Sequence, residues 1–296
     1  MFEFSRSVIT MSSTGLLVFG AGLAAYSREM VRKRPLERAI ALGRVFVAAP
    51  LATFGGLHLA AAQGLSQMVP AWIPWHLFWA YLVGLALIAT GLSLVFGRLV
   101  RWSGLLCGAM LMIFVVTIHI PEVVAAPGDR FRWAVLLRDT GFAMGLLALA
   151  GSLEPRTTGW ARWITIGRIG FAVPVVFFAI EHFLHPEFAP CVPLERLTPG
   201  WIPAPRAWGY AVGAVLLASG ALLLANRWAR EAAAWLGMAV TVVVIIIYVP
   251  MIVPAHGTAE VVEAINYVAD TLLFAGTALT MAEAVERATP PAGLGR

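Results

Sequence analysis

Long apolar runs dominate this chain and limit what it can fold into. An apolar helix of about 20 residues is long enough to cross the hydrocarbon core of a bilayer. Runs of that length lie near residues 7–26, 43–62, 76–97, 103–120, 133–152, 166–185, 207–226, 233–252 and 262–283. Only 12% of the residues are charged, against roughly 25% in a soluble domain. The sequence therefore predicts an all-α integral membrane protein whose main partner is the lipid bilayer.

The last eight runs form two similar sets of four. A Gly-Arg pair at 43–44 returns at 167–168, and a Trp-Ile-Pro triplet at 72–74 returns at 201–203. Other residues that recur in step are Pro50 with Pro174, His58 with His182, Gly91 with Gly220, Pro121 with Pro250, and Asp139 with Asp270. Repetition of this kind marks a duplicated unit. Four spans are an even number, so both units enter the membrane in the same direction, which predicts a tandem parallel repeat of two four-helix bundles.

The repeat divides the chain into segments. These are an N-terminal transmembrane helix with a basic cytoplasmic loop (1–40), a first unit (41–153), a cytoplasmic linker (154–165), a second unit (166–285) and a cytoplasmic tail (286–296). The first apolar run has its basic cluster after it, whereas a signal peptide carries charge before the apolar stretch. We expect an extra, retained N-terminal helix, with cleavage near Ala24 as the alternative.

Basic residues fall mostly on one side of the predicted spans, which is the cytoplasmic side by the positive-inside rule. This distribution predicts a multi-pass protein of a bacterial-type inner (cytoplasmic) membrane with its N-terminus outside and its C-terminus cytoplasmic. The formal net charge of +5 follows from that asymmetry, so we expect no nucleic acid partner. Tryptophans lie at span ends or in loops, as in an aromatic belt at the lipid–water boundary.

Ionisable residues gather toward the outer side of this topology. Each ionisable group at membrane depth costs about 2.5–3.5 kcal/mol or more, so such groups face the bundle interior, pair with one another and mark functional sites. The sequence therefore predicts a polar chamber that opens outward. The candidate catalytic residues are Glu181, His182, Asp139 and Asp270, and the candidate ligand-binding residues are His58, His119, Glu122, Arg138, His185, Trp72 and Trp201.

Comparison of the two units separates structural from chemical candidates. Residues that occur in both units are suited to a structural role, as hydrogen-bonding groups within the bundle. Residues that differ between the units are better candidates for specialised chemistry, and these are Glu181, His185, His119, Glu122 and Arg138. A Glu-His pair in the membrane can carry protons near neutral pH.

The segment 181–185, Glu-His-Phe-Leu-His, also has the spacing of a metal-binding helix face. Pro186 ends the helix at once, however, and the first unit offers no second ligand motif. We therefore expect a proton-handling or hydrogen-bonding cluster and no metal. The proline-rich segments 67–74 and 197–203 cannot continue a helix, and we expect each to cap the outer end of its unit, with a surface loop anchored by Trp as the alternative.

The pattern resembles the DoxX-like family. Each unit opens with Gly-Arg, carries a Pro-x-Trp-Ile-Pro-like segment after its first helix and ends in a helix with a buried Asp. The first unit also has Ile-His-Ile-Pro at 118–121 and Arg138 next to Asp139. The resemblance covers about 43–152 and 168–284. It implies a redox-associated membrane function, because some relatives take part in quinone-linked thiosulfate oxidation and others in membrane redox or thiol-stress systems.

Two classes of function remain open. The first is a quinone-linked membrane component with a membrane or periplasmic redox partner, in which quinone is favoured over haem or metal as the cofactor. The second is a non-enzymatic scaffold, or a binding protein or carrier for a small hydrophobic ligand. A third reading, isomerisation of a lipid-soluble substrate initiated by Glu181 or Asp270, needs no cofactor, and no motif selects it.

Overall fold

The computed structural model describes residues 5–154, 159, 161–192 and 194–288. Within these residues the fold is all-helical, with an isolated bridge between Phe188 and Leu197 and no β-strand. The long helices are α1 (Arg6–Val31), α2 (Pro35–Ala60), α4 (His76–Phe96), α5 (Val100–Phe114), α7 (Arg130–Ser152), α8 (Ala161–Leu184), α9 (Pro205–Leu224), α10 (Ala229–Val243) and α11 (Gly257–Ala288). Every predicted apolar run is confirmed as a helix or helical stretch that is long and apolar enough to cross a membrane.

Short elements join these helices. They are α3 (Ala62–Leu65), the 3₁₀ turns η1 (Ser66–Met68) and η4 (Pro250–Ile252), the π-helical segments η2 (Val115–His119) and η3 (Val244–Tyr248), and α6 (Ile120–Ala125). α2 begins at Pro35 and so includes part of the predicted basic loop, because proline is pre-organised for the first position of a helix. In the predicted linker, residues 155–158 and 160 lie outside the described residues, as does the predicted tail from residue 289.

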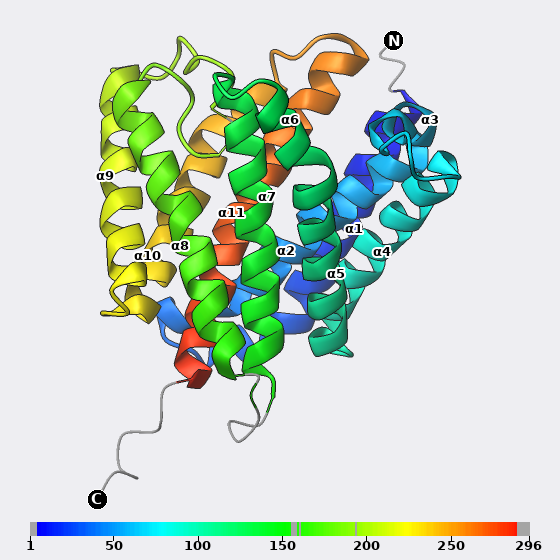
Figure 1. Cartoon of the computed structure of the whole chain (residues 1–296). Coiled ribbons are helices and arrows are strands. Elements are labelled where there is room, and N and C mark those ends of the chain that lie inside the picture. Colours follow the sequence, from blue (N-terminus) through cyan, green and yellow to red (C-terminus); the bar gives the residue numbers. More distant parts are fainter. Residues whose placement is uncertain (1–4, 155–158, 160, 193, 289–296) are drawn as a thin grey trace, which may run out of the picture.

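The first helix of each half packs against the last helix of the other half. α2 lies along α11, α8 lies along α7, and α7 and α11 also contact each other (Figure 1). Glycines bring the backbones close: an added Cβ at Gly276 of α11 would lie 2.6 Å from the backbone carbon of Phe46 in α2. On the other side, an added Cβ at Gly167 of α8 would lie 2.5 Å from the carbonyl oxygen of Met144 in α7. The two halves are therefore interlocked along their length.

Backbone irregularities occur at corresponding places in both halves. The third long helix of each half, α5 or α10, runs into a π-helical segment, η2 or η3. Residues with a left-handed backbone conformation, which non-glycine residues rarely adopt, also recur in pairs. The pairs are Trp75 with Ala204, Gly97 with Asn226, and Leu99 with Trp228.

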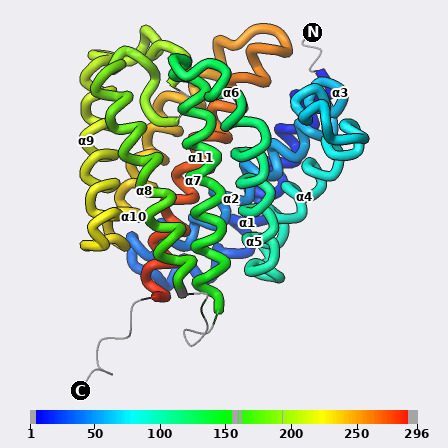
Figure 2. The backbone as a smooth tube through the Cα atoms, in the orientation of Figure 1, coloured from blue at the N-terminus to red at the C-terminus, as the bar shows by residue number. Residues whose placement is uncertain are grey.

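The outer surface is apolar, as a protein in lipid requires. Exposed large side chains cover α1, α4, α9 and the lipid-facing sides of α5 and α10, and no tryptophan of the described residues is buried. Trp72 is 74% exposed and Trp201 is 48% exposed, so both lie on the surface. The N-terminal end of α1 and the C-terminal end of α11 lie at opposite ends of the bundle (Figure 2). The chain is thus a multi-pass membrane protein by its helices and surface.

The two loops that follow α2 and α8 differ in structure. The loop after α2 is largely exposed. The loop after α8 folds back over the bundle and buries Ala189, Cys191, Val192, Leu194 and Ile202 in the core. Polar contacts hold it there, because the Tyr248 hydroxyl donates to the carbonyl oxygen of Pro190 at 2.7 Å. Of the two predicted caps, 67–74 has no buried residue and 197–203 buries Ile202 alone, while the other buried residues of the second loop lie before the predicted cap.

Candidate functional site

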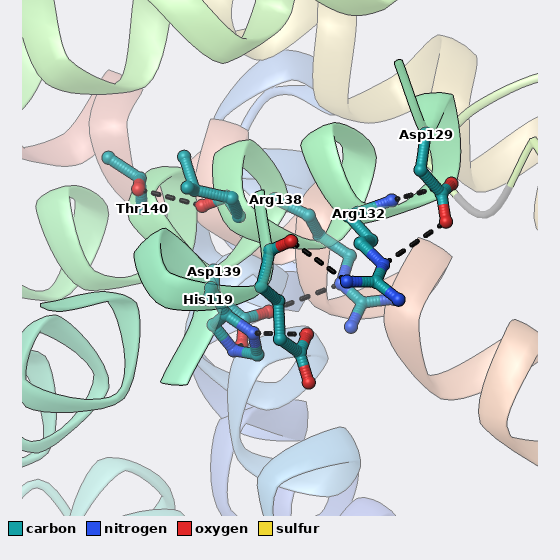
Figure 3. A network of polar contacts seen from close by, with 8 residues as sticks. His119, Asp129, Arg132, Arg138, Asp139 and Thr140 are labelled. Carbon is teal, nitrogen blue, oxygen red and sulfur yellow. Dashed lines mark hydrogen bonds and ion pairs between the residues drawn. The ribbon is translucent and has the colours of Figure 1, made fainter. Parts of the chain in front are cut away.

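A chain of four ionisable side chains crosses the interface between the halves, and we call it the buried chain. His119 Nε2 lies 3.0 Å from Asp139 Oδ2, and Arg138 Nε donates to Asp139 Oδ1 at 3.2 Å (Figure 3). Arg138 Nη1 donates to Asp270 Oδ2 at 2.7 Å. The relative exposure of these side chains is between 9% and 16%. Of the predicted residues, the structure brings these four together in one connected cluster, and Glu122 lies at its edge, with Oε2 3.9 Å from His119 Nδ1.

Three elements position the buried chain. His119 ends the π-helical segment η2, and such segments occur frequently at functional sites. Arg138 and Asp139 are neighbours on α7, and the long guanidinium side chain turns back to its own neighbour while reaching α11. Asp129 caps the start of α7 by accepting from the backbone N–H of Phe131 at 2.9 Å, which fixes the end of that helix. The site therefore depends on the contact between α7 and α11.

The charges in the buried chain do not cancel. One guanidinium stands between two carboxylates, so the cluster carries one excess negative charge when His119 is neutral. A buried charge without compensation is costly, and the cluster can remove it by binding a proton. Either the His119 ring or a carboxylate can accept that proton. The buried chain is thus a place where one proton can be taken up or released.

The two ring nitrogens of His119 have different surroundings. Nε2 faces the Asp139 carboxylate and is the nitrogen that donates to it. Nδ1 is buried without a hydrogen-bond partner in the described part of the chain, and the nearest carboxylate oxygen, Oε2 of Glu122, is 3.9 Å away. The side chain of Glu122 is 49% exposed. A histidine whose one nitrogen is fixed by an aspartate leaves the other as a proton acceptor.

His58 and His182 lie apart from the buried chain, each in the contact between the first two long helices of its half. Each Nδ1 donates to the carbonyl oxygen one turn earlier, of Phe54 or Phe178. His182 Nε2 also accepts from the backbone N–H of Cys191 at 2.8 Å. Both nitrogens of His182 are therefore in use, which leaves neither available to a metal ion.

The other residues of segment 181–185 have separate partners. Glu181 Oε2 lies 3.5 Å from Arg130 Nη1, where the last turn of α8 meets the first turn of α7. His185 Nδ1 lies 4.0 Å from Glu187 Oε1, and both side chains are 39% exposed. The predicted unit of Glu181, His182 and His185 is thus divided among a salt bridge, a loop contact and the protein surface. Its predicted catalytic role stays a prediction.

A second polar group, which sequence reasoning missed, lies beside the buried chain, and we call it the outer arm. It consists of Glu195 and Arg196 from the loop after α8, and Glu263 and Tyr267 from α11. The Tyr267 hydroxyl contacts Glu195 Oε2 at 2.8 Å and also the Glu263 carboxylate, which Arg196 holds through Nε at 3.0 Å and through Nη2. Glu195 and Arg196 are loop residues and carry no periodic signal, whereas Glu263 and Tyr267 have helical spacing from Asp270 on α11 that could have indicated them.

Tyr248 is the one further residue that the repeat does indicate. It stands in the second half where His119 stands in the first, at the end of a π-helical segment. Its ring centroid is 6.5 Å from that of Tyr267, and its hydroxyl bonds to the loop after α8. The two corresponding positions thus have different tasks, one at the buried chain and one in holding a loop.

A shallow hollow on the surface is lined by Trp75, His76, Leu77 and Phe78 at the start of α4, away from the buried chain. The chain matches no protein-family model, no curated protein and no solved structure. Within the part of the chain described, the class that fold and site define is therefore a multi-pass helical membrane protein with a buried ionisable cluster.

Proposed function

We propose that this protein is a DoxX-like, redox-associated membrane component in which His119 exchanges a proton with a quinone-class ligand. The observation that carries the proposal is the His119 ring, with Nε2 fixed by Asp139 and Nδ1 buried without a partner. The hydroxyl of a quinol head group can donate the missing hydrogen bond to Nδ1 of the neutral ring, and the carbonyl of a quinone can accept one from the protonated ring. A lipid-soluble ligand of this kind suits a site inside the bilayer.

The proton balance follows from the chemistry of quinones. Oxidation of a quinol to a quinone releases two protons and two electrons. His119 Nδ1 accepts one proton, Asp139 stabilises the imidazolium that forms, and Arg138 keeps Asp139 ionised. The second proton would leave to water, and the two electrons would be accepted by the membrane or periplasmic redox partner that the proposal requires. In the opposite direction the same groups supply a proton to a quinone.

The first test is the quinone content of protein purified in mild detergent. We expect the wild type to retain quinone and His119→Gln to retain it roughly tenfold more weakly, because a lost hydrogen bond at a buried group is about 1.5 kcal/mol. His256→Gln is the matched control, because His256 is exposed and is not part of the buried chain. Wild-type protein without quinone, or equal retention by His119→Gln, would contradict the proposal. A reduced-minus-oxidised absorption spectrum of the same sample measures whether the bound quinone changes its redox state.

The orientation and the duplication belong to the same proposal. We infer a tandem parallel repeat because the backbone irregularities recur in pairs and because the first helix of each half packs on the last helix of the other. We also infer that the N-terminus and the loop after α8 face the outside of a bacterial-type inner membrane and that the C-terminus is cytoplasmic. In that orientation the buried chain is nearer the outside.

Cysteine labelling tests this orientation. The native Cys107 and Cys191 are buried, and burial raises the pKa of the Cys191 thiol, so little thiolate forms there at neutral or mildly alkaline pH. We expect no labelling of the folded wild type by a membrane-impermeant maleimide. Gly200→Cys, at an exposed loop position, should react in intact cells, and Ser27→Cys, exposed at the other end of α1, only after permeabilisation. The reverse labelling pattern would show that the orientation is opposite to the one inferred.

A non-enzymatic scaffold is the second candidate function. It is favoured by the Arg138–Asp270 contact, which joins the two halves and can be wholly structural. The interlocked helices favour a scaffold over a carrier, because a carrier moves one half against the other. For a scaffold, Arg138 variants lose stability while wild-type protein holds no quinone.

A further inference from the structure

The outer arm connects the buried chain with water. The side chain of Arg196 is 45% exposed and that of Glu263 is 36% exposed, whereas Tyr267 is 6% exposed. Glu263, Tyr267 and Asp270 follow one another along the same side of α11, about one turn apart. These three side chains form a row that runs from the surface to the buried chain. The Glu195 carboxylate also lies within electrostatic range of the Arg138 guanidinium. Polar groups are thus present at each level from water to Asp270.

Hydrogen counting singles out Glu195 in this arm. The Tyr267 hydroxyl has one proton, yet its oxygen lies within hydrogen-bond distance of two carboxylates. Arg196 pairs with Glu263 through two nitrogens and so holds Glu263 as the anion that accepts from Tyr267. The contact between Glu195 Oε2 and the phenol oxygen can then be a hydrogen bond only if Glu195 brings a proton of its own.

Charge and exposure place Glu195 at the water side of the outer arm. The buried chain and the outer arm together hold four carboxylates, of Asp139, Asp270, Glu195 and Glu263, and two guanidiniums, of Arg138 and Arg196. The excess is two negative charges when His119 is neutral. One proton on the buried chain would remove the part of this excess that is buried, and Glu195 is exposed, so its carboxylate can exchange a proton with water. The charged and titratable groups around Glu195 are Tyr267 and Glu263 of α11, Arg138 of α7, and the adjacent Arg196.

We propose that Glu195 is the outer proton port of the buried chain. The Glu195 carboxylate takes a proton from outside water and becomes a carboxylic acid that donates to the Tyr267 oxygen. It then gives that proton to the Asp270 carboxylate, one turn beyond Tyr267 on α11, and returns to the carboxylate form. Tyr267 and Arg196 are positioning residues, because they fix Glu195 and Glu263 without taking up the proton themselves.

This inference rests on the proposed function, since a proton port serves a site that exchanges protons. Failure of the two is distinguishable, because the port is measured with or without quinone. Full-length protein is deposited as a film and studied by infrared spectroscopy. The carboxylic acid C=O band is followed as the pH is changed, and its shift is then timed after H₂O is replaced by D₂O.

We expect the wild type to gain a carboxylic acid band on acidification that is missing in Glu195→Gln and shifted in Tyr267→Phe. Isotope exchange of the remaining Asp bands should slow roughly 100-fold in Glu195→Gln, the lower end of what a positioned proton carrier contributes. Glu187→Gln in the same loop is the control, since among the described residues the Glu187 carboxylate has one ion-pair contact, with His185 at 4.0 Å. An unchanged band, or unchanged exchange, in Glu195→Gln would overturn the proton port even if quinone is bound.

Discussion

Replacing Arg138 with glutamine is expected to destabilise the protein by about 3–5 kcal/mol, the usual result of removing one partner from a buried ion pair. The guanidinium contacts both Asp139 and Asp270, and no other cation of the described residues forms an ion pair with Asp270. Without it, two carboxylates remain near each other in a region of low dielectric. Thermal unfolding in detergent, followed by circular dichroism, measures the effect.

Two further variants make this result specific. Arg138→Gln combined with Asp270→Asn removes the unpaired acid together with its partner and should restore much of the lost stability. Arg196→Gln is the matched control, because Arg196 is 45% exposed and exposed ion pairs contribute about 1 kcal/mol or less. If Arg138→Gln unfolds at the temperature of Arg196→Gln, the buried chain does not hold the halves together.

The helices were predictable because an apolar run of bilayer length has few alternatives in lipid. The helix ends were less so. α2 begins at Pro35 and takes in polar residues such as Glu37, since helical hydrogen bonding continues past the apolar stretch. The hydropathy pattern does not predict where the helix begins outside the apolar stretch. It also could not separate the loop after α2 from the loop after α8, although both carry the same Trp-Ile-Pro triplet.

The members of the buried chain were predictable, but their connections were not. Intramembrane charge identified His119, Arg138, Asp139 and Asp270 without a structure. Their contacts depend on the packing of α7 against α11, which no spacing in the sequence specifies. The same signal drew attention to His182, whose nitrogens are both occupied by backbone groups. Periodicity cannot distinguish a satisfied histidine from one with a free nitrogen.

The interlocked packing has a consequence for any ligand at the buried chain. α7 and α11 are the two helices that supply Arg138 and Asp270, and each is held along its length by the first helix of the opposite half. Close glycine contacts leave little room for these helices to slide. The proposed proton exchange would therefore occur by movement of side chains and water, because close backbone contacts hold these helices against each other.

Replacing Gly276 with alanine tests how tight this packing is. The added Cβ would lie 2.6 Å from the backbone carbon of Phe46 and 2.7 Å from the backbone nitrogen of Val47. Backbone atoms cannot rotate away, so α2 must shift from α11, and overpacking of this kind costs about 1–3 kcal/mol or more. The expected result is a lower unfolding temperature and weaker retention of any ligand that needs Arg138 and Asp270 in register.

Gly20→Ala is the control for this prediction. Gly20 lies inside α1, is exposed, and has no atom within 4 Å of an added Cβ. The same substitution should therefore be neutral or stabilising by up to about 1 kcal/mol, the difference in helix propensity between the two residues. If both variants have the same unfolding temperature, α2 and α11 lie farther apart than the 2.6 Å contact of an added Cβ implies. The halves could then move against each other, and a carrier would become the better reading of the fold.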